Sequence, residues 1–313
     1  MKSFTLLILA TMLVVSAPVS ASRRKTYPMN VPADGVRTVT FKLQEGDFVL
    51  RGDPSAREVR MNVSIDRTWI FKLGEEGILQ RLITVSGQGT DHVTIVTDIP
   101  RAISNWGRAQ YPIDFEVVVP SGVRLEIEDT SGKIELSGLT GDVAVRDGSG
   151  TFSARELRGS LDLLKESGDI RIEHVAGATT IQSHSGQMTL RRLRALEIRE
   201  SDGNIDASQL ASARIHNRGG NLRVTSVSGE LHIDDDSGEI VLADVGGAVD
   251  IRDTSGQIRT ENTGAITLRD TSGDVTIRHA PEVRVLEKES GAVKVRSVTG
   301  RVDAPPGIEI KRQ

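Results

Sequence analysis

The chain of 313 residues has no cysteine, few aromatic residues and, after about its fifteenth residue, no apolar run long enough to span a membrane. Without cysteine neither a disulfide framework nor a lipid-modified N-terminal cysteine can form, so burial and hydrogen bonding must hold the fold. Aromatic side chains make up only 3% while glycine occurs 31 times, which indicates many tight turns around an aliphatic core. The formal charge of −4 argues against nucleic acid as a partner.

The N-terminus has the pattern of a cleaved signal peptide over residues 1–21. Lys2 provides the positive n-region, residues 4–15 are almost continuously apolar, and Val19-Ser20-Ala21 offers the small residues that signal peptidase requires. The alternative is an uncleaved anchor, but that needs about twenty apolar residues, and polar residues and a proline interrupt this run earlier. Since no transmembrane segment remains after cleavage, we expect a secreted protein of the periplasm, the cell surface or the medium.

A Ser-Gly dipeptide, or a close variant of it, returns every seventeen or eighteen residues from Ser131 onward. A second glycine column falls about halfway between successive copies. Turns between short strands need residues that tolerate positive φ, which glycine does without a steric penalty. We therefore assign a structural role in turns to the glycines of the first column, which are Gly132, Gly150, Gly168, Gly186, Gly203, Gly220, Gly238, Gly256, Gly273 and Gly291.

Apolar and polar residues alternate between the glycines, as the pairs Ile240 and Leu242 or Val249 and Ile251 illustrate. This is the period of a strand with one buried face. An array of antiparallel hairpins also alternates, but only a solenoid, whose coils stack about 4.8 Å apart, requires the sequence to repeat at the coil length. The sequence therefore predicts an all-β fold with a single-stranded β-solenoid of about ten coils over residues 121–304. In such a rod the residues at 134, 170, 240 and 258 share one interior column.

The region before the repeat, residues 22–120, lacks the eighteen-residue register but contains strand-like alternation, for example over 36–43 and 113–119. We expect it to form an N-terminal β-rich cap or lead-in domain, with a short helix over 74–82. Residues 305–313 are expected to form a C-terminal tail.

Residues 115–125, continuing into Ser131-Gly132-Lys133-Ile134 and Gly141-Asp142-Val143, resemble the bacterial putative adhesin domains of unknown function built from β-strand repeats, of the domain-of-unknown-function 4097 type. The resemblance covers roughly residues 30–304 and lies in the register of many copies. It implies a right-handed β-solenoid in an exported or envelope-facing protein. The family offers no catalytic residues to carry over.

An acidic column stands three residues before the corner glycines, and Asp235, Asp253 and Asp270 occupy it in consecutive coils. Stacked about 4.8 Å apart, each like-charged pair costs about 1 kcal/mol in water. The interpretation that we favour is structural: solvated turn carboxylates that cap backbone amides, with Arg252 and Arg269 compensating their charge. The alternative is a calcium ladder, although the glycine-rich nonapeptides of calcium-binding β-rolls are absent. We thus expect no bound metal and no cofactor.

No motif indicates catalysis, because the histidines lack metal-ligand spacing and neither a nucleophile elbow nor a phosphate-binding loop is present. We expect a non-enzymatic, adhesin-like binding or scaffold module of the envelope, whose partner is an envelope polymer, a membrane component or a protein. One alternative is a polysaccharide-processing β-helix enzyme, although the nearly constant coil length leaves no insertions that would build a cleft. The other is an envelope-stress sensor that acts through a protein partner.

Overall fold

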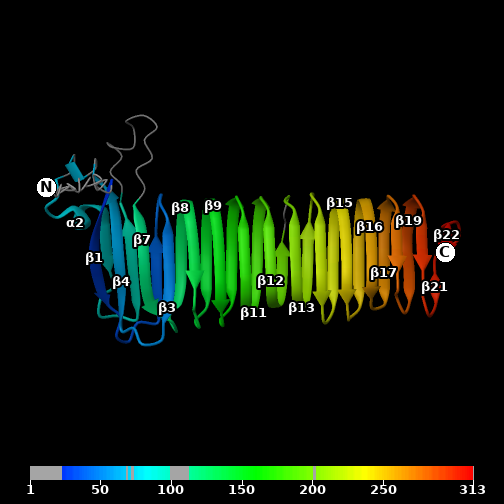
Figure 1. Ribbon diagram of the computed structural model, residues 1–313, viewed down its shortest axis with the longest axis horizontal. Coiled ribbons are helices and arrows are strands. Elements are labelled where there is room, and N and C mark those ends of the chain that lie inside the picture. The colour runs from blue at the N-terminus through cyan, green and yellow to red at the C-terminus, as the bar shows by residue number, and fades with distance from the viewer. Residues whose placement is uncertain (1–22, 68–69, 72–73, 99–112, 200–201, 313) are drawn as a thin grey trace, which may run out of the picture.

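The computed structural model describes residues 23–67, 70–71, 74–98, 113–199 and 202–312, which form a rod of stacked strands (Figure 1). The predicted signal peptide lies outside the described residues. A short helix, α2 (Ile78–Leu82), lies at the N-terminal end, and no helix of the described residues is long and apolar enough to cross a membrane. The strands are β1 (Arg24–Pro32), β2 (Thr38–Lys42), β3 (Phe48–Asp53), β4 (Glu58–Asp66), β5 (Ile83–Ser86), β6 (His92–Thr97), β7 (Asp114–Pro120), β8 (Arg124–Ser137), β9 (Val143–Leu157), β10 (Leu161–Ser167), β11 (Ile170–Ser185), β12 (Met188–Arg199), β13 (Ile205–Asn217), β14 (Leu222–Val227), β15 (Leu231–Val245), β16 (Val249–Thr263), β17 (Ile266–Ser272), β18 (Val275–Arg278), β19 (Val283–Ser290), β20 (Val293–Arg296), β21 (Val302–Asp303) and β22 (Ile310–Arg312).

Each coil from β8 onward has one segment before the Ser-Gly corner and one after it. The segments before the corner form one side of the rod, which we call the first face. The segments after the corner form the other side, which we call the second face. In β15 and β16 both segments pair in parallel with the next coil, so that Leu231 lies opposite Val249 and Ile240 opposite Ile258. The residues that pair are seventeen or eighteen positions apart, as the repeat predicts. The β-solenoid is thus confirmed, and an array of antiparallel hairpins is excluded for these coils.

The predicted interior column is continuous. Its members on the second face, each opposite the next, are Phe48, Ile134, Phe152, Ile170, Met188, Ile205, Leu222, Ile240, Ile258, Val275 and Val293. All of them are buried, and burying a side chain of this size contributes about 2 kcal/mol. The alternation of the sequence therefore places one aliphatic or aromatic ladder inside the rod on this side.

The corner glycines stack directly on one another. At Gly256 a Cβ atom would overlap the carbonyl oxygen of Gly238 one coil below, and the same overlap recurs along the column. Nine of the ten predicted corner glycines also have positive φ, Gly203 being the exception. Two separate constraints, close approach of the neighbouring backbone and a left-handed conformation, therefore select glycine here.

The second glycine column has a different cause from the first. Its members, such as Gly247, are not among the residues with positive φ, but a Cβ there would overlap the backbone of the coil below. The left-handed position in this half of the coil lies a few residues earlier; Gly138 occupies it in the first of these coils, and non-glycine residues with φ between 53° and 64° occupy it in the later ones. They are Glu156, His174, Arg192, Gln209, Ser226, Asp244, Asn262, His279 and Ser297.

The stacked coils begin before residue 121, so the stacking crosses the predicted boundary at residue 120. Strands β2 and β3 form a coil beneath β8, in which Phe48 lies opposite Ile134 and Gly46 lies beneath Gly132. Strands β6 and β7 pair in parallel under that coil, and β4, β1 and β5 add antiparallel strands at this end. The order of these coils along the rod differs from their order in the sequence. The β2–β3 coil comes before the β6–β7 coil in the sequence, but in the rod it lies between the β6–β7 coil and β8. The predicted helix over 74–82 forms only as α2.

The C-terminal tail covers the last coil. Pro305 accepts a hydrogen bond of 3.4 Å from the amide of Ile308, and the chain then forms β22, which pairs in parallel with β20. Strand β21 pairs with β19 on the first face. The interior under β19 and β20 is thereby shielded by the chain itself.

Candidate binding groove

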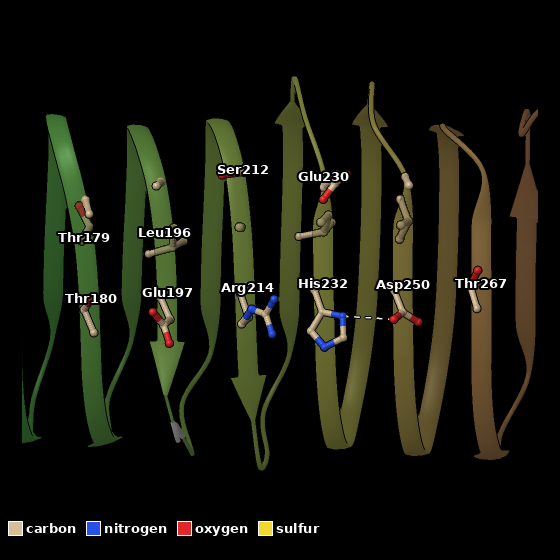
Figure 2. A pocket seen from close by; sticks show the side chains of 16 residues that line it. Thr179, Thr180, Leu196, Glu197, Ser212, Arg214, Glu230, His232, Asp250 and Thr267 are labelled. Atoms are coloured by element: carbon tan, nitrogen blue, oxygen red, sulfur yellow. Dashed lines mark ion pairs between the residues drawn. The ribbon is translucent and has the colours of Figure 1, made fainter.

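A groove of about 560 Å³ runs along the first face of the rod, from β11 across to β17 (Figure 2). Its residues come from consecutive coils, so the groove follows the rod axis and crosses the strands. Each coil contributes equivalent positions, because parallel pairing keeps the coils in register. The site is therefore a product of the repeat.

Small side chains form the floor of the groove. The outward position at the start of each first-face segment carries alanine or serine in four of five successive coils and a glutamate in the other, and its members are Ala178, Ala195, Ser212, Glu230 and Ala248. Because methyl and hydroxymethyl groups project little, the underlying Leu196 and Leu231 also line the groove although they belong to the core. The floor is thus mainly apolar.

A row of polar side chains runs beside this floor, two positions later in each strand. Figure 2 shows these side chains one after another across the strands, in the order Thr180, Glu197, Arg214, His232, Asp250 and Thr267. Neighbouring members are one coil apart, about 4.8 Å. The row therefore presents hydrogen-bond donors, acceptors and both signs of charge at a fixed spacing along the groove.

Ion pairs hold several members of the row. His232 Nδ1 lies 3.3 Å from Asp250 Oδ2, and Arg269 Nη1 lies 3.2 Å from Asp250 Oδ1. The hydrogen bond of 2.9 Å from Arg199 holds the pKa of the Glu197 carboxyl below its usual range. Such partly exposed pairs contribute at most about 1 kcal/mol each, so a ligand's polar groups can replace them at little cost.

The polar side chains of the row are spread along the groove. Its side chains lie side by side instead of converging on one point (Figure 2). In the described part of the chain no serine or threonine hydroxyl hydrogen-bonds to His232, so the His232–Asp250 pair lacks the nucleophile that acyl transfer requires. What the groove offers is an apolar strip flanked by evenly spaced donors and acceptors.

The predicted acidic column lies inside the rod and not in solvated turns, which corrects our expectation. We call it the inner ladder, and its described members are Asp129, Asp147, Lys165, Ser183, Asn217, Asp235, Asp253, Asp270 and Lys288. Three residues before a corner the chain still follows the strand alternation, so the side chain points inward. The stacking of Asp235, Asp253 and Asp270 in consecutive coils is as predicted.

Charge compensation also differs from the prediction. Arg252 and Arg269 point outward and pair with Asp234 and Asp250 on the first face. Two of the buried carboxylates are instead compensated from within the ladder: Lys165 pairs with Asp147, and Lys288 Nζ lies 2.7 Å from Asp270 Oδ2. Among the described residues no group of three or more histidine, aspartate or glutamate side chains is placed to hold a metal ion.

The groove itself was not recognised from the sequence. A signal for it exists, because alanine follows the second-column glycine in Gly177-Ala178, Gly247-Ala248 and Gly264-Ala265. That signal becomes visible only when the outward positions of successive coils are aligned with one another, whereas the alternation draws attention to the inward positions.

Comparison with known proteins gives one match to a protein family. Residues 175–305 match the model of the family described as Toastrack DUF4097. No curated protein matches the chain.

Solved structures are similar to this chain at low identity, and three of them serve as examples. A putative adhesin from Bacteroides fragilis is 12% identical with a TM-score of 0.33, and the match covers 87% of this chain and 97% of that one. A putative adhesin from Parabacteroides distasonis is 9% identical with a TM-score of 0.32 and the same two coverages. A protein from the same species, described as a putative lipid binding protein, is 15% identical with a TM-score of 0.30, covering 90% and 96%. The family match agrees with the resemblance of the sequence: residues 175–305 are similar to the Toastrack DUF4097 family.

Proposed function

We propose that this protein is a non-enzymatic, adhesin-like binding module of the cell envelope, and that the groove on its first face binds an extended polymer along the rod. The observation that carries this proposal is the in-register row from Thr180 to Thr267 beside a floor of small side chains. A binding surface that repeats every coil suits a ligand that itself repeats.

The spacing of the row favours a polysaccharide as the polymer. Two coils span about 9.6 Å, close to the length of an extended disaccharide, so every second coil meets an equivalent sugar. Hydroxyl groups both donate and accept hydrogen bonds, which matches the mixture of acceptors and donors that Glu197, Arg214 and Asp250 provide along the row. The apolar strip at Ala195 and Ala248 suits the C–H face of a sugar ring.

The polysaccharide-processing alternative has less support. Enzymatic sites on such rods need charged groups that converge in a cleft, whereas the coils between residues 121 and 304 scarcely vary in length. The charged groups of the groove are instead spread over successive coils and paired with their neighbours.

The test is binding of purified envelope polysaccharides, both neutral and acidic, measured by isothermal titration calorimetry with the mature protein. Ala248→Trp fills the floor of the groove, and we expect it to weaken binding at least about tenfold, which corresponds to 1.4 kcal/mol. The matched control is Ala243→Trp, because Ala243 lies five residues earlier, in β15, and points outward on the second face. Equal binding by both variants, or binding of none of the polysaccharides by the parent protein, would contradict the assignment of the groove. Appearance of shorter glycan products would overturn the non-enzymatic part of the proposal.

Export is part of the proposal and rests on the pattern of residues 1–21. Fractionation of cells that produce the full chain tests it. We expect the protein in the periplasmic or surface fraction, with an N-terminus at about residue 22 by Edman sequencing. An intact N-terminus in the cytoplasm would contradict it.

A further inference from the structure

The inner ladder holds more acids than bases, in two separate runs. The first run contains Asp129, Asp147 and Lys165, and the second contains three aspartates followed by Lys288. Each run ends in a lysine, which leaves one carboxyl in excess in the first run and two in the second. All of these side chains are removed from solvent.

The first run places its excess carboxyl at Asp129. Lys165 Nζ is paired with Asp147, so its charge is already compensated. On the other side of Asp129, its neighbour in the coil beneath is the apolar Leu43. Lys42 lies opposite Glu128, so the next residue, Leu43, falls at the position of Asp129. Burial, and then the charge of Asp147, raise the pKa of Asp129 to about 7, although the backbone amides of Thr130 and Ser131 and the charge of Lys165 act in the opposite direction.

The second run begins with a neutral partner and ends with a charged one. Asn217 Nδ2 donates a hydrogen bond of 2.7 Å to Asp235 Oδ1, and Lys288 pairs with Asp270. Asp253 lies between Asp235 and Asp270 with no cation of the ladder opposite it.

Burial dominates the titration of this run as well. It raises the pKa of Asp253 to about 7, with further increases from the charges of Asp270 and Asp235 and a partial offset from the amides of Ser255 and Thr254. Burial also raises the pKa of Asp235 to about 6. There the charges of Asp236 and Asp234 add to the increase, while Asn217 and His216 oppose it.

We propose that the inner ladder stores three protons in the folded rod, on Asp129, Asp235 and Asp253, and that the rod is thereby a pH-sensitive element whose stability rises as the medium becomes mildly acidic. The geometry requires this number. An uncompensated charge in the dry interior raises the free energy of the folded state, and each run becomes neutral only when its excess carboxyls are protonated. The proposal is independent of what the groove binds.

The direction follows from proton binding. In the unfolded chain these carboxyls titrate near their ordinary value of 3.8, whereas in the fold they retain protons up to about pH 6 to 7. The folded state therefore binds more protons than the unfolded state between these limits, so the stability falls as the pH rises. The contribution is fully present below about pH 4 and is lost as the pH passes through about 7.

The experiment is thermal unfolding of the mature protein from about pH 5.5 to about pH 8.5, compared with the triple variant Asp129→Asn, Asp235→Asn, Asp253→Asn. Asparagine has the shape of a protonated aspartate but does not titrate. We expect the parent Tm to fall by several degrees from the acid to the alkaline end, and the Tm of the triple variant to be nearly constant. A parent Tm that is constant or rises with pH, or a triple variant that keeps the parent slope, would overturn the proposal.

Two further variants and one direct measurement complete the test. Asp162→Asn removes an exposed carboxyl on the first face and should leave the slope unchanged. His216→Gln with His232→Gln removes two histidines that pair with Asp234 and Asp250 on the first face, outside the inner ladder, and most of the slope should remain. If the triple variant does not fold, carbon NMR of the carboxyl groups in the folded parent decides: three aspartates that titrate between about pH 6 and 7 support the proposal, and their absence overturns it.

Discussion

Lys288 Nζ donates a hydrogen bond of 2.7 Å to Asp270 Oδ2 inside the rod, and a second of 2.6 Å to the carbonyl of Gly273, so that a buried lysine ties the inner ladder to the corner. Removing one partner of a buried pair leaves the other charge uncompensated. We expect Lys288→Met to destabilise the rod by about 3 kcal/mol in urea unfolding at pH 7. The control is Lys294→Met, where an exposed pair with Asp274 is lost and at most about 1 kcal/mol should change. Equal effects of the two variants would show that the buried pair contributes no more than a surface pair.

A charge placed in the interior column tests the orientation of the strands. Ile240 is fully buried between Leu222 and Ile258, so Ile240→Asp puts a carboxylate where no partner can reach it. We expect a loss of at least about 4 kcal/mol, visible as a large drop in Tm or as insoluble protein. Val241→Asp changes the next residue, which points outward, and should cost less than about 1 kcal/mol. A soluble Ile240→Asp protein with the parent Tm would contradict the assigned inward face.

Two variants separate the two constraints that select glycine at the corners, close approach of the neighbouring backbone and positive φ. Gly256→Ala places a methyl group against the carbonyl of Gly238 at a φ of 148°, and we expect a loss of about 3 kcal/mol in unfolding free energy. Gly89→Ala is the matched control, because Gly89 also has positive φ, 82°, but an added methyl group meets no atom within 4 Å. There only the left-handed penalty remains, about 1 kcal/mol. Similar losses in both variants would mean that close approach of the coils contributes little.

The repeat predicts the rod because the features that define a coil are local in the sequence. Glycine marks each corner, and alternation marks each inward side chain, so Ile134, Ile170, Ile240 and Ile258 fall on one column as predicted. The first coils were missed because β2 and β3 are separated from β8 by strands that lie elsewhere in the stack. Contact between segments so distant in the chain leaves no periodic signal.

The candidate site was predicted less well, for a physical reason. Hydropathy assigns an aspartate before a turn to solvent, yet Asp253 belongs to the inward series and is only 2% exposed. The groove depends on what neighbouring coils present side by side, as Ala195 and Ser212 do, and this appears only when the coils are in register. Residues that repeat in chemical type are found by inspection, whereas those that repeat only in position require the structure.

The left-handed column is the feature that the sequence conceals most completely, since its residues share a conformation but no chemical character. Gln209 has φ 58° and carries no charge, so substitutions there isolate the backbone effect. Gln209→Gly relieves a left-handed penalty of about 1 to 2 kcal/mol and adds about 0.4 to 1 kcal/mol of unfolded-state entropy, so we expect a net gain of about 0.5 kcal/mol. Gln209→Val introduces a β-branched side chain that tolerates positive φ poorly, and we expect a loss of about 1 kcal/mol or more. Urea unfolding midpoints measure both, and a valine variant as stable as the glycine variant would show that this position is not held in the left-handed conformation in solution.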